Sequence, residues 1–395
     1  MDLMTLDDKD FIIEIAKRII PVKSISPASG GNGEGERALV IENILKEMGF
    51  SDYKVYSVED DKGIPRVSVV LKVGNMDRTV WLISHTDTVP EGDPKLWTRP
   101  PFEVTVDGNK IYGRGTSDDG QAVFLSFLLL KHLKKDSLKY NLGLAFVADE
   151  EVGSKYGIQY LLDQNIFRQA DIIYVPDAGA EDGMDMEIAE KSILWLQFTV
   201  KGKQYHASLP QNAINANRDG MEFILAIDKM LHEKYNAKDE IFNYPYSTFE
   251  PTKHLKNVDN INTIPGLETF FMDCRILPQY DLDNVIDDIQ MAKSEFEQTH
   301  KSRITIDPVQ KEQAPIPTPS DAEAVKLLKE ALSKRGGIPR AVGIGGGTCA
   351  AFFRRKGMNA VVWSTTMPDV AHQVDEYCVI DHILMDRETL EQIIY

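Results

Sequence analysis

Short runs of apolar residues, bounded by polar or glycine-containing segments, recur through the first half of the chain. Runs of this length fit buried strands, and they occur at 67–73, 80–83, 142–147 and 172–175. Apolar residues at intervals of three and four predict helices, which we place at 10–20, 36–48, 121–133, 321–334 and 380–394. Apolar strands separated by helices predict an α/β fold, in which a mixed sheet carries helices on both faces.

A second kind of pattern begins near Glu190. Residues 194–200 alternate apolar and polar side chains, which is typical of a half-exposed strand in an antiparallel sheet. Helix and strand patterns follow at 218–233, 267–276, 282–299 and 304–306. This succession predicts an inserted α+β two-layer sandwich. We therefore divide the chain into the first part of one domain (1–191), an inserted domain (192–308) and the second part of the first domain (309–395).

Composition and charge narrow the class of protein. The formal net charge of −17 argues against nucleic acid or an anionic membrane as partner. Three scattered cysteines, Cys274, Cys349 and Cys378, exclude a disulfide framework and a CxxC zinc knuckle. The amino-terminal residues do not show the pattern of a signal peptide, and no apolar run approaches the length of about 18 residues that a membrane span needs. We expect a cytoplasmic protein.

Residues that can bind metals follow three of the predicted strands directly. His85 and Asp87 come after the second strand, Glu150 and Glu151 after the third, and Asp177 after the fourth. In open α/β sheets, ligand sites form beyond the carboxyl ends of strands. Taken singly, a His-x-Asp pair is usually structural and an acid after a strand is usually an exposed loop residue. Their recurrence after successive strands predicts one shared site.

Two further residues have side chains suited to the same site. Asp118 precedes the helix predicted at 121–133, where an aspartate is also an ordinary helix cap. His372 lies in a loop before the last helix. Imidazoles and carboxylates without thiolates suit Zn²⁺, Co²⁺ or Mn²⁺ at a catalytic site rather than a structural zinc. A pair of such ions can share a water and lower its pKa.

Four motifs carry these residues in a characteristic order: Ser84-His85-Thr-Asp87-Thr-Val-Pro90, Tyr112-Gly-Arg-Gly-Thr-Ser-Asp118, Asp149-Glu150-Glu151 and Ala371-His372. In their order and spacing they resemble the motifs of the M20 family of di-zinc metallohydrolases, and the resemblance covers essentially the whole chain. It implies a zinc-exopeptidase-like fold with an inserted lid or dimerisation domain. It also implies two divalent ions per chain, Zn²⁺ first and Co²⁺ or Mn²⁺ as alternatives, and a homodimer through the inserted domain.

The resemblance assigns five metal ligands. His85 and Asp177 would hold one ion, Glu151 and His372 would hold the other, and Asp118 would bridge the two. The nucleophile implied by the family is a water shared by both ions.

Three further residues would act in catalysis. Asp87 would orient His85. Glu150 would be the general base, which takes a proton from the water and returns it to the leaving amine. His206, in the segment Lys-Gln-Tyr-His-Ala-Ser, would stabilise the carbonyl oxyanion, often across a dimer in this family. The alternative for His206 is an ordinary surface residue on a loop.

Four residues match family positions that line the substrate site. Asn262 and Arg275 would hold a substrate carboxylate, for which a guanidinium fork is suited; the alternative for Arg275 is an internal salt bridge to a helix acid. Gly347 and Thr348 belong to a segment whose backbone lines the pocket. The chain departs from the family with Cys349-Ala350 in place of Ser-Asp, with Gly120-Gln121 where a lysine is usual, and with Asp375 in place of Asn. None of these is an expected ligand, so the departures concern specificity.

The implied function is hydrolysis of an amide bond in a small substrate that carries a carboxylate. N-succinyl-diaminopimelate is the first candidate, and a dipeptidase, a carboxypeptidase or an N-acyl-amino-acid deacylase would use the same chemistry. A nucleotide-binding protein is disfavoured because the glycine run at 343–347 continues neither as a P-loop nor as a complete G-x-G-x-x-G. A non-catalytic binding protein of the same fold is disfavoured because the expected ligands and the base are all present.

Overall fold

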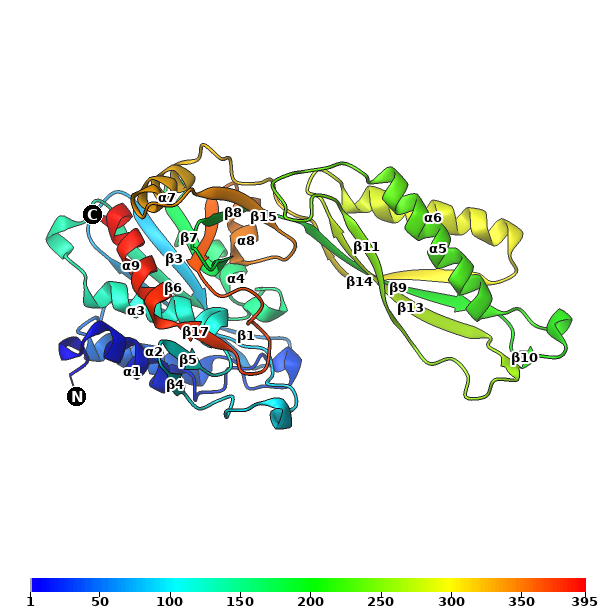
Figure 1. Cartoon of the computed structure of the whole chain (residues 1–395), viewed down its shortest axis with the longest axis horizontal. Coiled ribbons are helices and arrows are strands. Elements are labelled where there is room, and N and C mark those ends of the chain that lie inside the picture. The colour runs from blue at the N-terminus through cyan, green and yellow to red at the C-terminus, as the bar shows by residue number, and fades with distance from the viewer. Residues whose placement is uncertain (1) are drawn as a thin grey trace. The chain divides into compact units, whose positions relative to one another are not determined.

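The computed structural model of this protein describes residues 2–395, and the chain divides into two compact units (Figure 1). Unit 1 comprises the chain up to Ile188 together with Thr318–Val342 and Thr348–Tyr395. Unit 2 comprises Ala189–Pro317 and Gly343–Gly347. The chain therefore begins and ends in unit 1, with most of unit 2 inserted between the two parts.

The centre of unit 1 is a mixed eight-stranded sheet with the order β1-β2-β6-β3-β7-β16-β8-β15. Its strands are β1 (Tyr53–Glu59), β2 (Pro65–Val73), β3 (Thr79–His85), β6 (Asn141–Val147), β7 (Ile172–Ala180), β8 (Asp185–Glu190), β15 (Arg340–Ile344) and β16 (Ala360–Thr365). The four middle strands β6, β3, β7 and β16 are parallel to one another, and β1, β2 and β8 pair antiparallel to their neighbours. The parallel strands bring their carboxyl ends to one edge of the sheet.

Helices cover both faces of this sheet (Figure 1). They are α1 (Asp8–Ile19), α2 (Gly35–Glu47), α3 (Gln121–Lys131), α4 (Ile158–Asp163), α7 (Glu323–Lys334), α8 (Cys349–Arg355) and α9 (Ile380–Ile394). On one face, α4 and α8 pack on alternate residues of the strands, among them Trp81 and Ile83. On the other face, Phe127 of α3 stacks on Phe146 with ring centroids 5.3 Å apart. The predicted mixed sheet with helices on both faces is confirmed.

Close packing in the sheet depends on one glycine. The Trp81 ring lies across Gly143 of the neighbouring strand, and a Cβ at this position would lie 2.3 Å from Trp81 Cε3. Any side chain here would displace the indole. A small three-stranded sheet, β17-β5-β4, completes unit 1 with β4 (Thr105–Asp107), β5 (Lys110–Tyr112) and β17 (Tyr377–Val379).

Unit 2 contains a four-stranded antiparallel sheet with the order β11-β13-β9-β14. Its elements are β9 (Ser192–Lys201), α5 (Ala216–Lys234), β11 (Thr248–His254), β13 (Leu267–Ile276), α6 (Leu282–Thr299) and β14 (Arg303–Glu312), with a short pair β10 (Tyr205–His206) and β12 (Thr263–Ile264). Side chains of α5, such as Phe223 and Ile227, form one core with inward residues of the strands, such as Phe198. Two helices packed on one antiparallel sheet form a two-layer arrangement.

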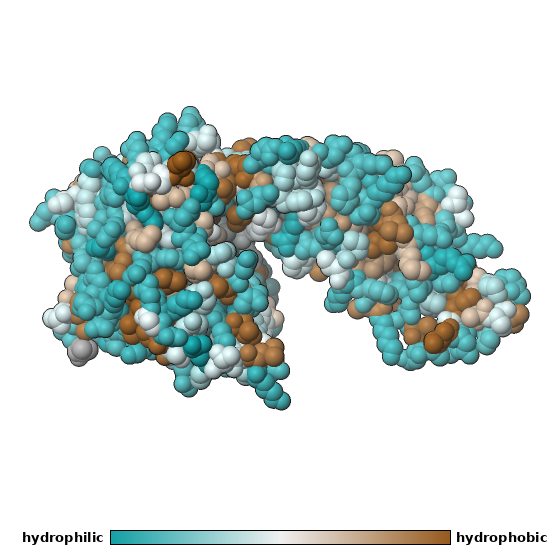
Figure 2. All heavy atoms as spheres, in the orientation of Figure 1, coloured by the Kyte–Doolittle hydropathy of each residue, from teal (hydrophilic) through white to brown (hydrophobic). Residues whose placement is uncertain are grey.

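The face of each unit that is visible in Figure 2 is largely hydrophilic, with small hydrophobic patches. Within residues 2–395, no helix combines the length and the apolar character that crossing a bilayer would require.

Candidate metal centre

The first histidine of the predicted site is the last residue of β3. His85 is 3 % exposed, and its backbone N–H donates to Asp119 Oδ2 at 3.0 Å. Its Nδ1 lies 3.1 Å from the backbone oxygen of Asp87, so the opposite ring nitrogen, Nε2, is the one directed toward the acidic residues. The strand therefore determines both the place and the orientation of this imidazole.

The acidic pair lies in the loop that follows β6. Asp149, which begins this loop, has a left-handed backbone with φ of 70°, and Glu150 and Glu151 come directly after it. The loop ends at Gly157, where a Cβ would lie 1.7 Å from the carbonyl oxygen of Ala148. Only glycine permits this close approach, which returns the chain toward its starting point before α4 begins.

Asp177 is positioned differently from the prediction. It lies within β7, which extends to Ala180, and not beyond the end of a strand that stops at residue 175. The β7–β16 pairing is irregular between Val362 and Ser364, which face Val175 and Gly179 respectively. Asp177 therefore lies on the irregular part of its strand, where the alternation of side chains is interrupted.

Asp118 lies in the turn Thr116–Gly120 and does not cap the following helix. The cap of α3 is Gly120, with no side-chain capping bond. Four donors anchor this turn to the buried carboxylate of Glu376: the backbone N–H groups of Gly115, Ser117 and Asp118, at 3.0, 2.9 and 3.2 Å, and Arg114 Nη1 at 2.6 Å. The alternative role of Asp118 as a cap is thus wrong, and its side chain is directed to the histidines.

The two oxygens of Asp118 face two different imidazoles. Oδ1 lies 2.6 Å from His85 Nε2, and Oδ2 lies 2.9 Å from His372 Nε2. His85 Nε2 is also 3.8 Å from Asp177 Oδ1, and His372 Nε2 is 3.1 Å from Glu151 Oε2. The arrangement has two halves, one with His85 and Asp177 and the other with His372 and Glu151, joined by the carboxylate of Asp118.

Asp87 connects the histidine loop to the acidic loop. Its carboxylate is fully buried, and Oδ1 lies 3.4 Å from His85 Nδ1. The same carboxylate accepts the backbone N–H of Glu150 at 3.0 Å through Oδ1 and that of Glu151 at 3.1 Å through Oδ2. Asp87 therefore holds the loop that carries the expected base, in addition to contacting the histidine that it was expected to orient.

The pKa values reflect the crowding of charge in this cluster. Burial and the negative charge of Asp177 raise the pKa of Glu150 well above its ordinary value. Burial opposes ionisation of His85, but hydrogen bonds with Asp118 and Asp87 outweigh it and raise the pKa of His85 well above its ordinary value. Hydrogen bonds with Asp118 and Glu151 raise the pKa of His372 to about 10. Both histidines therefore have raised pKa values because carboxylates surround them, and bound metal ions would balance the same negative charge.

The donor set fits divalent metal ions. Among residues 2–395, two groups have ligand atoms within 4.8 Å of one another: His85 with Glu150 and Asp177, and His85 with Asp118 and Glu151. These atoms are imidazole nitrogens and carboxylate oxygens, the ligands of catalytic rather than structural zinc. Four carboxylates close together also need compensating positive charge, which two divalent cations would supply.

The residue expected to stabilise the oxyanion, His206, and two residues expected to bind the substrate carboxylate, Asn262 and Arg275, lie in unit 2. His206 is exposed on β10 of unit 2, with Nδ1 2.7 Å from Ser208 Oγ, and Asn262 is an exposed loop residue of the same unit. Arg275 on β13 donates to Asp273 through Nε at 2.7 Å and Nη2 at 3.0 Å, and to the Gly345 oxygen through Nη1 at 3.1 Å. Its internal salt bridge is thus to a neighbour on its own strand and not to a helix acid.

The glycine segment is divided between the units. Gly347 belongs to unit 2, whereas Thr348 belongs to unit 1 and caps α8, with Oγ1 accepting the N–H of Ala350 at 3.2 Å. Cys349, the departure from the family pattern, is buried 4.0 Å from Ser154 Oγ, and burial raises the pKa of its thiol well above its ordinary value. It is therefore a thiol and not a thiolate at neutral pH.

Several residues that shape the site had no role in the sequence prediction. Glu376 anchors the turn of Asp118, Asp119 receives the N–H of His85, and Arg37 donates to the Thr86 oxygen at 2.9 Å. The only signal for Glu376 was its place in the motif after His372. The other two lacked a signal, because their bonds go to backbone atoms of distant segments.

Comparison with known proteins identifies the family of the chain. The sequence profile of peptidase family M20/M25/M40 matches residues 81–395. The chain is 40% identical to an uncharacterized metallohydrolase of Methanococcus maripaludis, over 95% of this chain and 96% of that one. It is 27% identical to an acetylornithine deacetylase of Pectobacterium carotovorum, over 97% of each, and 25% identical to a succinyl-diaminopimelate desuccinylase of Rickettsia bellii, over 93% and 92%. The aminopeptidase PepT of Bacillus cereus has the same fold, with a TM-score of 0.75 at 18% identity over 98% of each chain.

Proposed function

The chain belongs to peptidase family M20/M25/M40, and from that premise we propose that it is a metal-dependent deacylase that removes the acyl group from an N-acylated amino acid. Membership makes it a hydrolytic enzyme that acts on amide bonds, with divalent metals as cofactors. The substrate class is our proposal. The hydrolytic chemistry is supported by the site: Asp118 faces His85 with one oxygen and His372 with the other, and Glu150, whose pKa is raised, has a ligand atom within 4.8 Å of those of His85 and Asp177. The choice of an N-acylated amino acid is supported by the full-length relatives named as a deacetylase and a desuccinylase.

The five ligands are His85, Asp177, Asp118, Glu151 and His372, in the two halves described above. Two divalent ions held there, Zn²⁺ first, would lower the pKa of a water and polarise the carbonyl of the scissile amide. The ligand type supports Zn²⁺, Co²⁺ or Mn²⁺ as the metal, because these ions suit nitrogen and oxygen donors without thiolates.

Glu150 carries the proton in this proposal. Its carboxylate accepts a proton from the attacking water and returns it to the amide nitrogen as the carbon–nitrogen bond breaks. A base for this task needs a pKa nearer to neutrality than that of an ordinary glutamate, and burial together with Asp177 shifts the pKa of Glu150 in that direction. Asp87 holds the backbone of Glu150 and so directs this carboxylate.

Three residues of unit 2 complete the proposal. His206 would stabilise the oxyanion that develops on the carbonyl. Asn262 and Arg275 would bind the substrate carboxylate. The three hydrogen bonds of Arg275 to Asp273 and Gly345 use three of its five N–H groups, so two N–H groups remain for a ligand. Gly347 and Thr348 would line the pocket with backbone atoms.

The first substrates to test come from the relatives and from the sequence prediction. N-succinyl-diaminopimelate and N-acetylornithine each join an acyl group to the nitrogen of an amino acid, and enzymes named for these two reactions are full-length relatives. Dipeptides are the second class, because a peptidase would use the same base and the same metals.

The experiment is hydrolysis of N-succinyl-diaminopimelate, N-acetylornithine and unblocked dipeptides by protein reconstituted with Zn²⁺, Co²⁺ or Mn²⁺, each with and without a chelator. Cleavage of an N-acyl amino acid that chelator abolishes and added metal restores would support the proposal. Cleavage of dipeptides alone would refute the deacylase assignment. No cleavage of any substrate by metal-loaded protein would refute the proposed substrate class altogether.

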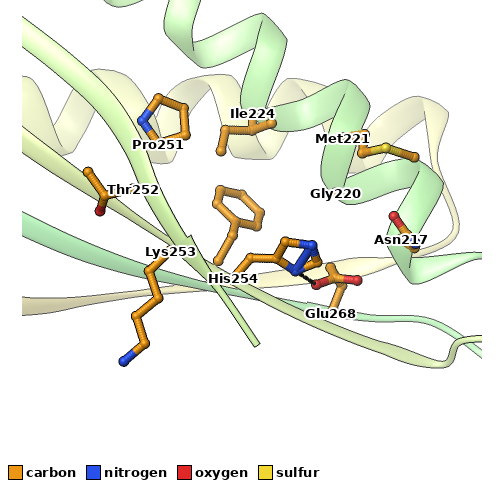
Figure 3. Close-up of a pocket in the computed structure, with 10 residues that line it drawn as sticks. Asn217, Gly220, Met221, Ile224, Pro251, Thr252, Lys253, His254 and Glu268 are labelled. Atoms are coloured by element: carbon orange, nitrogen blue, oxygen red, sulfur yellow. Dashed lines mark ion pairs between the residues drawn. The ribbon is translucent and has the colours of Figure 1, made fainter. Parts of the chain in front are cut away.

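We also propose that the protein is a cytoplasmic homodimer through unit 2. β11 is an edge strand of the antiparallel sheet, and Met221 and Leu225 on the adjacent helix α5 are 56% and 69% exposed. A pocket of about 280 Å³ lies between this helix and this strand, with Ile224 and Pro251 on its wall and an ion pair of 2.9 Å between His254 and Glu268 at its end (Figure 3). An unpaired strand edge beside an apolar helix surface suits pairing with a second copy.

A further inference from the structure

A cluster of fully buried charges lies behind the loop that carries the base. Arg66 of β2 is 2 % exposed, and its two acidic partners, Glu34 and Asp149, are 0 % and 2 % exposed. Arg66 Nε donates to Glu34 Oε2 at 2.8 Å, Nη1 donates to Asp149 Oδ1 at 2.6 Å, and Nη2 donates to Glu34 Oε1. One guanidinium therefore connects a residue just before α2 to the first residue of the acidic loop.

Asp149 transmits this connection to the backbone of the loop. Its N–H donates to Glu34 Oε1 at 3.3 Å, and its own Oδ2 accepts the N–H of Tyr156 at 2.9 Å. Its backbone oxygen accepts the N–H of Ser154 at 2.6 Å. Asp149, whose backbone is left-handed, is thus bonded both to the Glu34–Arg66 pair and to the later part of its own loop. Glu150 and Glu151 follow it directly in the sequence.

The same end of α2 also holds the histidine loop. Arg37, three residues after Glu34, donates through Nη1 to the oxygen of Thr86 at 2.9 Å and through Nη2 to the oxygen of Val22 at 2.7 Å. Thr86 lies between His85 and Asp87, and Asp87 accepts the N–H groups of Glu150 and Glu151. The two loops are therefore bonded to each other and to one helix start.

Stability alone is a weak reason for such a cluster. Replacing a buried ion pair by apolar residues of the same volume is often neutral or stabilising, since the charges must lose their water. What the fork of Arg66 provides, and an apolar residue does not, is a fixed direction: it bonds two carboxylates at once and so defines where Asp149 lies.

We infer that Glu34 and Arg66 are positioning residues for the reaction. They hold Asp149, and through its backbone they set the place of the Glu150 base and of the Glu151 ligand relative to His85 and Asp118. This inference rests on the proposed function. A displacement of about 1 Å at a reacting group can cost on the order of 100-fold in rate, so a network without any contact to substrate can govern turnover.

The test compares two matched substitutions, Glu34→Gln and Glu187→Gln. Glu187 is also buried and also accepts a guanidinium fork, from Arg354 Nη1 at 3.1 Å and Nη2 at 3.3 Å. The same guanidinium donates to Thr318 Oγ1 and to the Ala360 oxygen, so this second cluster joins other segments of the chain. Each change removes one carboxylate charge from a buried arginine. For both variants we would measure kcat, KM, Tm and Zn²⁺ affinity, the last by competition with a chromophoric chelator.

We expect both variants to lower Tm, and only Glu34→Gln to lower kcat and Zn²⁺ affinity, each by about 10- to 100-fold, with KM changed by less than about threefold. An unchanged kcat and affinity in folded Glu34→Gln protein, or equal losses in the Glu187→Gln control, would overturn the inference.

Two further measurements keep the test decisive. If Glu34→Gln does not fold, Arg66→Lys replaces it, because a single ammonium keeps the charge but not the two-sided fork. We expect Arg66→Lys to lower kcat and Zn²⁺ affinity by the same amounts. If neither kcat nor Zn²⁺ affinity falls, the positioning role is refuted. If the wild type cleaves no amide, the proposed function fails, but the Zn²⁺ affinities of the same variants still show whether this cluster positions Glu151.

Discussion

Asp87 offers the sharpest test of how the site is held together, through the substitution Asp87→Asn. The buried carboxylate accepts two backbone N–H groups, those of Glu150 at 3.0 Å and Glu151 at 3.1 Å, and its Oδ1 lies 3.4 Å from His85 Nδ1. Asparagine has nearly the same shape, but it has one acceptor oxygen where aspartate has two. One of the two N–H groups must then face an NH₂ group, and the charge beside His85 is lost.

The expected magnitude follows from these bonds. A hydrogen bond to a charged group contributes about 1.5–3 kcal/mol, and the donor left unpaired has no access to water in this buried place. If that energy is lost from the transition state, kcat falls by about 10- to 150-fold at 1.36 kcal/mol per factor of ten. KM should change little, because no atom of Asp87 is proposed to contact the substrate.

The assay is steady-state hydrolysis of whichever proposed substrate the wild type cleaves, with metal content measured on the same samples. Asp171→Asn is the matched control. Asp171 lies beside the opposite end of β3 and is also buried. Its carboxylate accepts the backbone N–H groups of Thr79 and Arg168 and the indole N–H of Trp81, each at 3.0 Å. The control should lose stability and keep its kcat. If Asp87→Asn turned over at the wild-type rate, or if both variants lost kcat equally, the assigned role would be wrong.

Four other outcomes are expected. Glu150→Gln should keep its metal and lose about 100- to 10,000-fold in kcat, as for a missing general base; a near-wild-type rate in a metal-loaded sample would exclude that role. His206→Ala should lower kcat without changing metal content, whereas loss of metal would indicate a ligand. For the proposed homodimer, light scattering after gel filtration should give a dimer mass for the wild type and a monomer mass for Leu225→Glu; equal masses for the two proteins would contradict an interface at this helix. Burial, against hydrogen bonds from Thr365, raises the pKa of Asp386 to about 7, so the folded state binds this proton more tightly than the unfolded chain. The contribution of Asp386 to the free energy of unfolding should therefore fall from about pH 4 to pH 7, and urea titrations of Asp386→Asn across this range should lack that contribution.

The elements with strong periodicity were predictable from the chain alone. The helices predicted at 282–299 and 380–394 have the observed bounds, and all four apolar runs are strands of the central sheet. β1 and α8 were not predicted. β1 is a sheet edge with mixed exposure, and its apolar residues at 53, 55, 56 and 58 do not keep a period of two. The seven residues of α8 are too few to show a helical period. Weak patterns of this kind become strands or helices because of their neighbours.

The types of residue in the site were also readable from the sequence, since imidazoles and carboxylates after successive parallel strands meet at one edge. The position of Asp177 was not, because it depends on an irregularity in the pairing of β7 with β16. The alternative of Asp118 as a cap could be rejected only when its two oxygens were seen facing His85 and His372.

What the sequence determined by itself is therefore local: periodicity decides helix or strand, and residue type decides which metals and which proton chemistry the site can support. What only the tertiary structure decided is which distant groups meet. Arg66 bonds residues 32 and 83 positions away, and Asp87 bonds the N–H groups of residues 63 and 64 positions away. Such bonds leave no periodic signal, because they depend on how buried donors and acceptors are paired once the whole sheet has assembled.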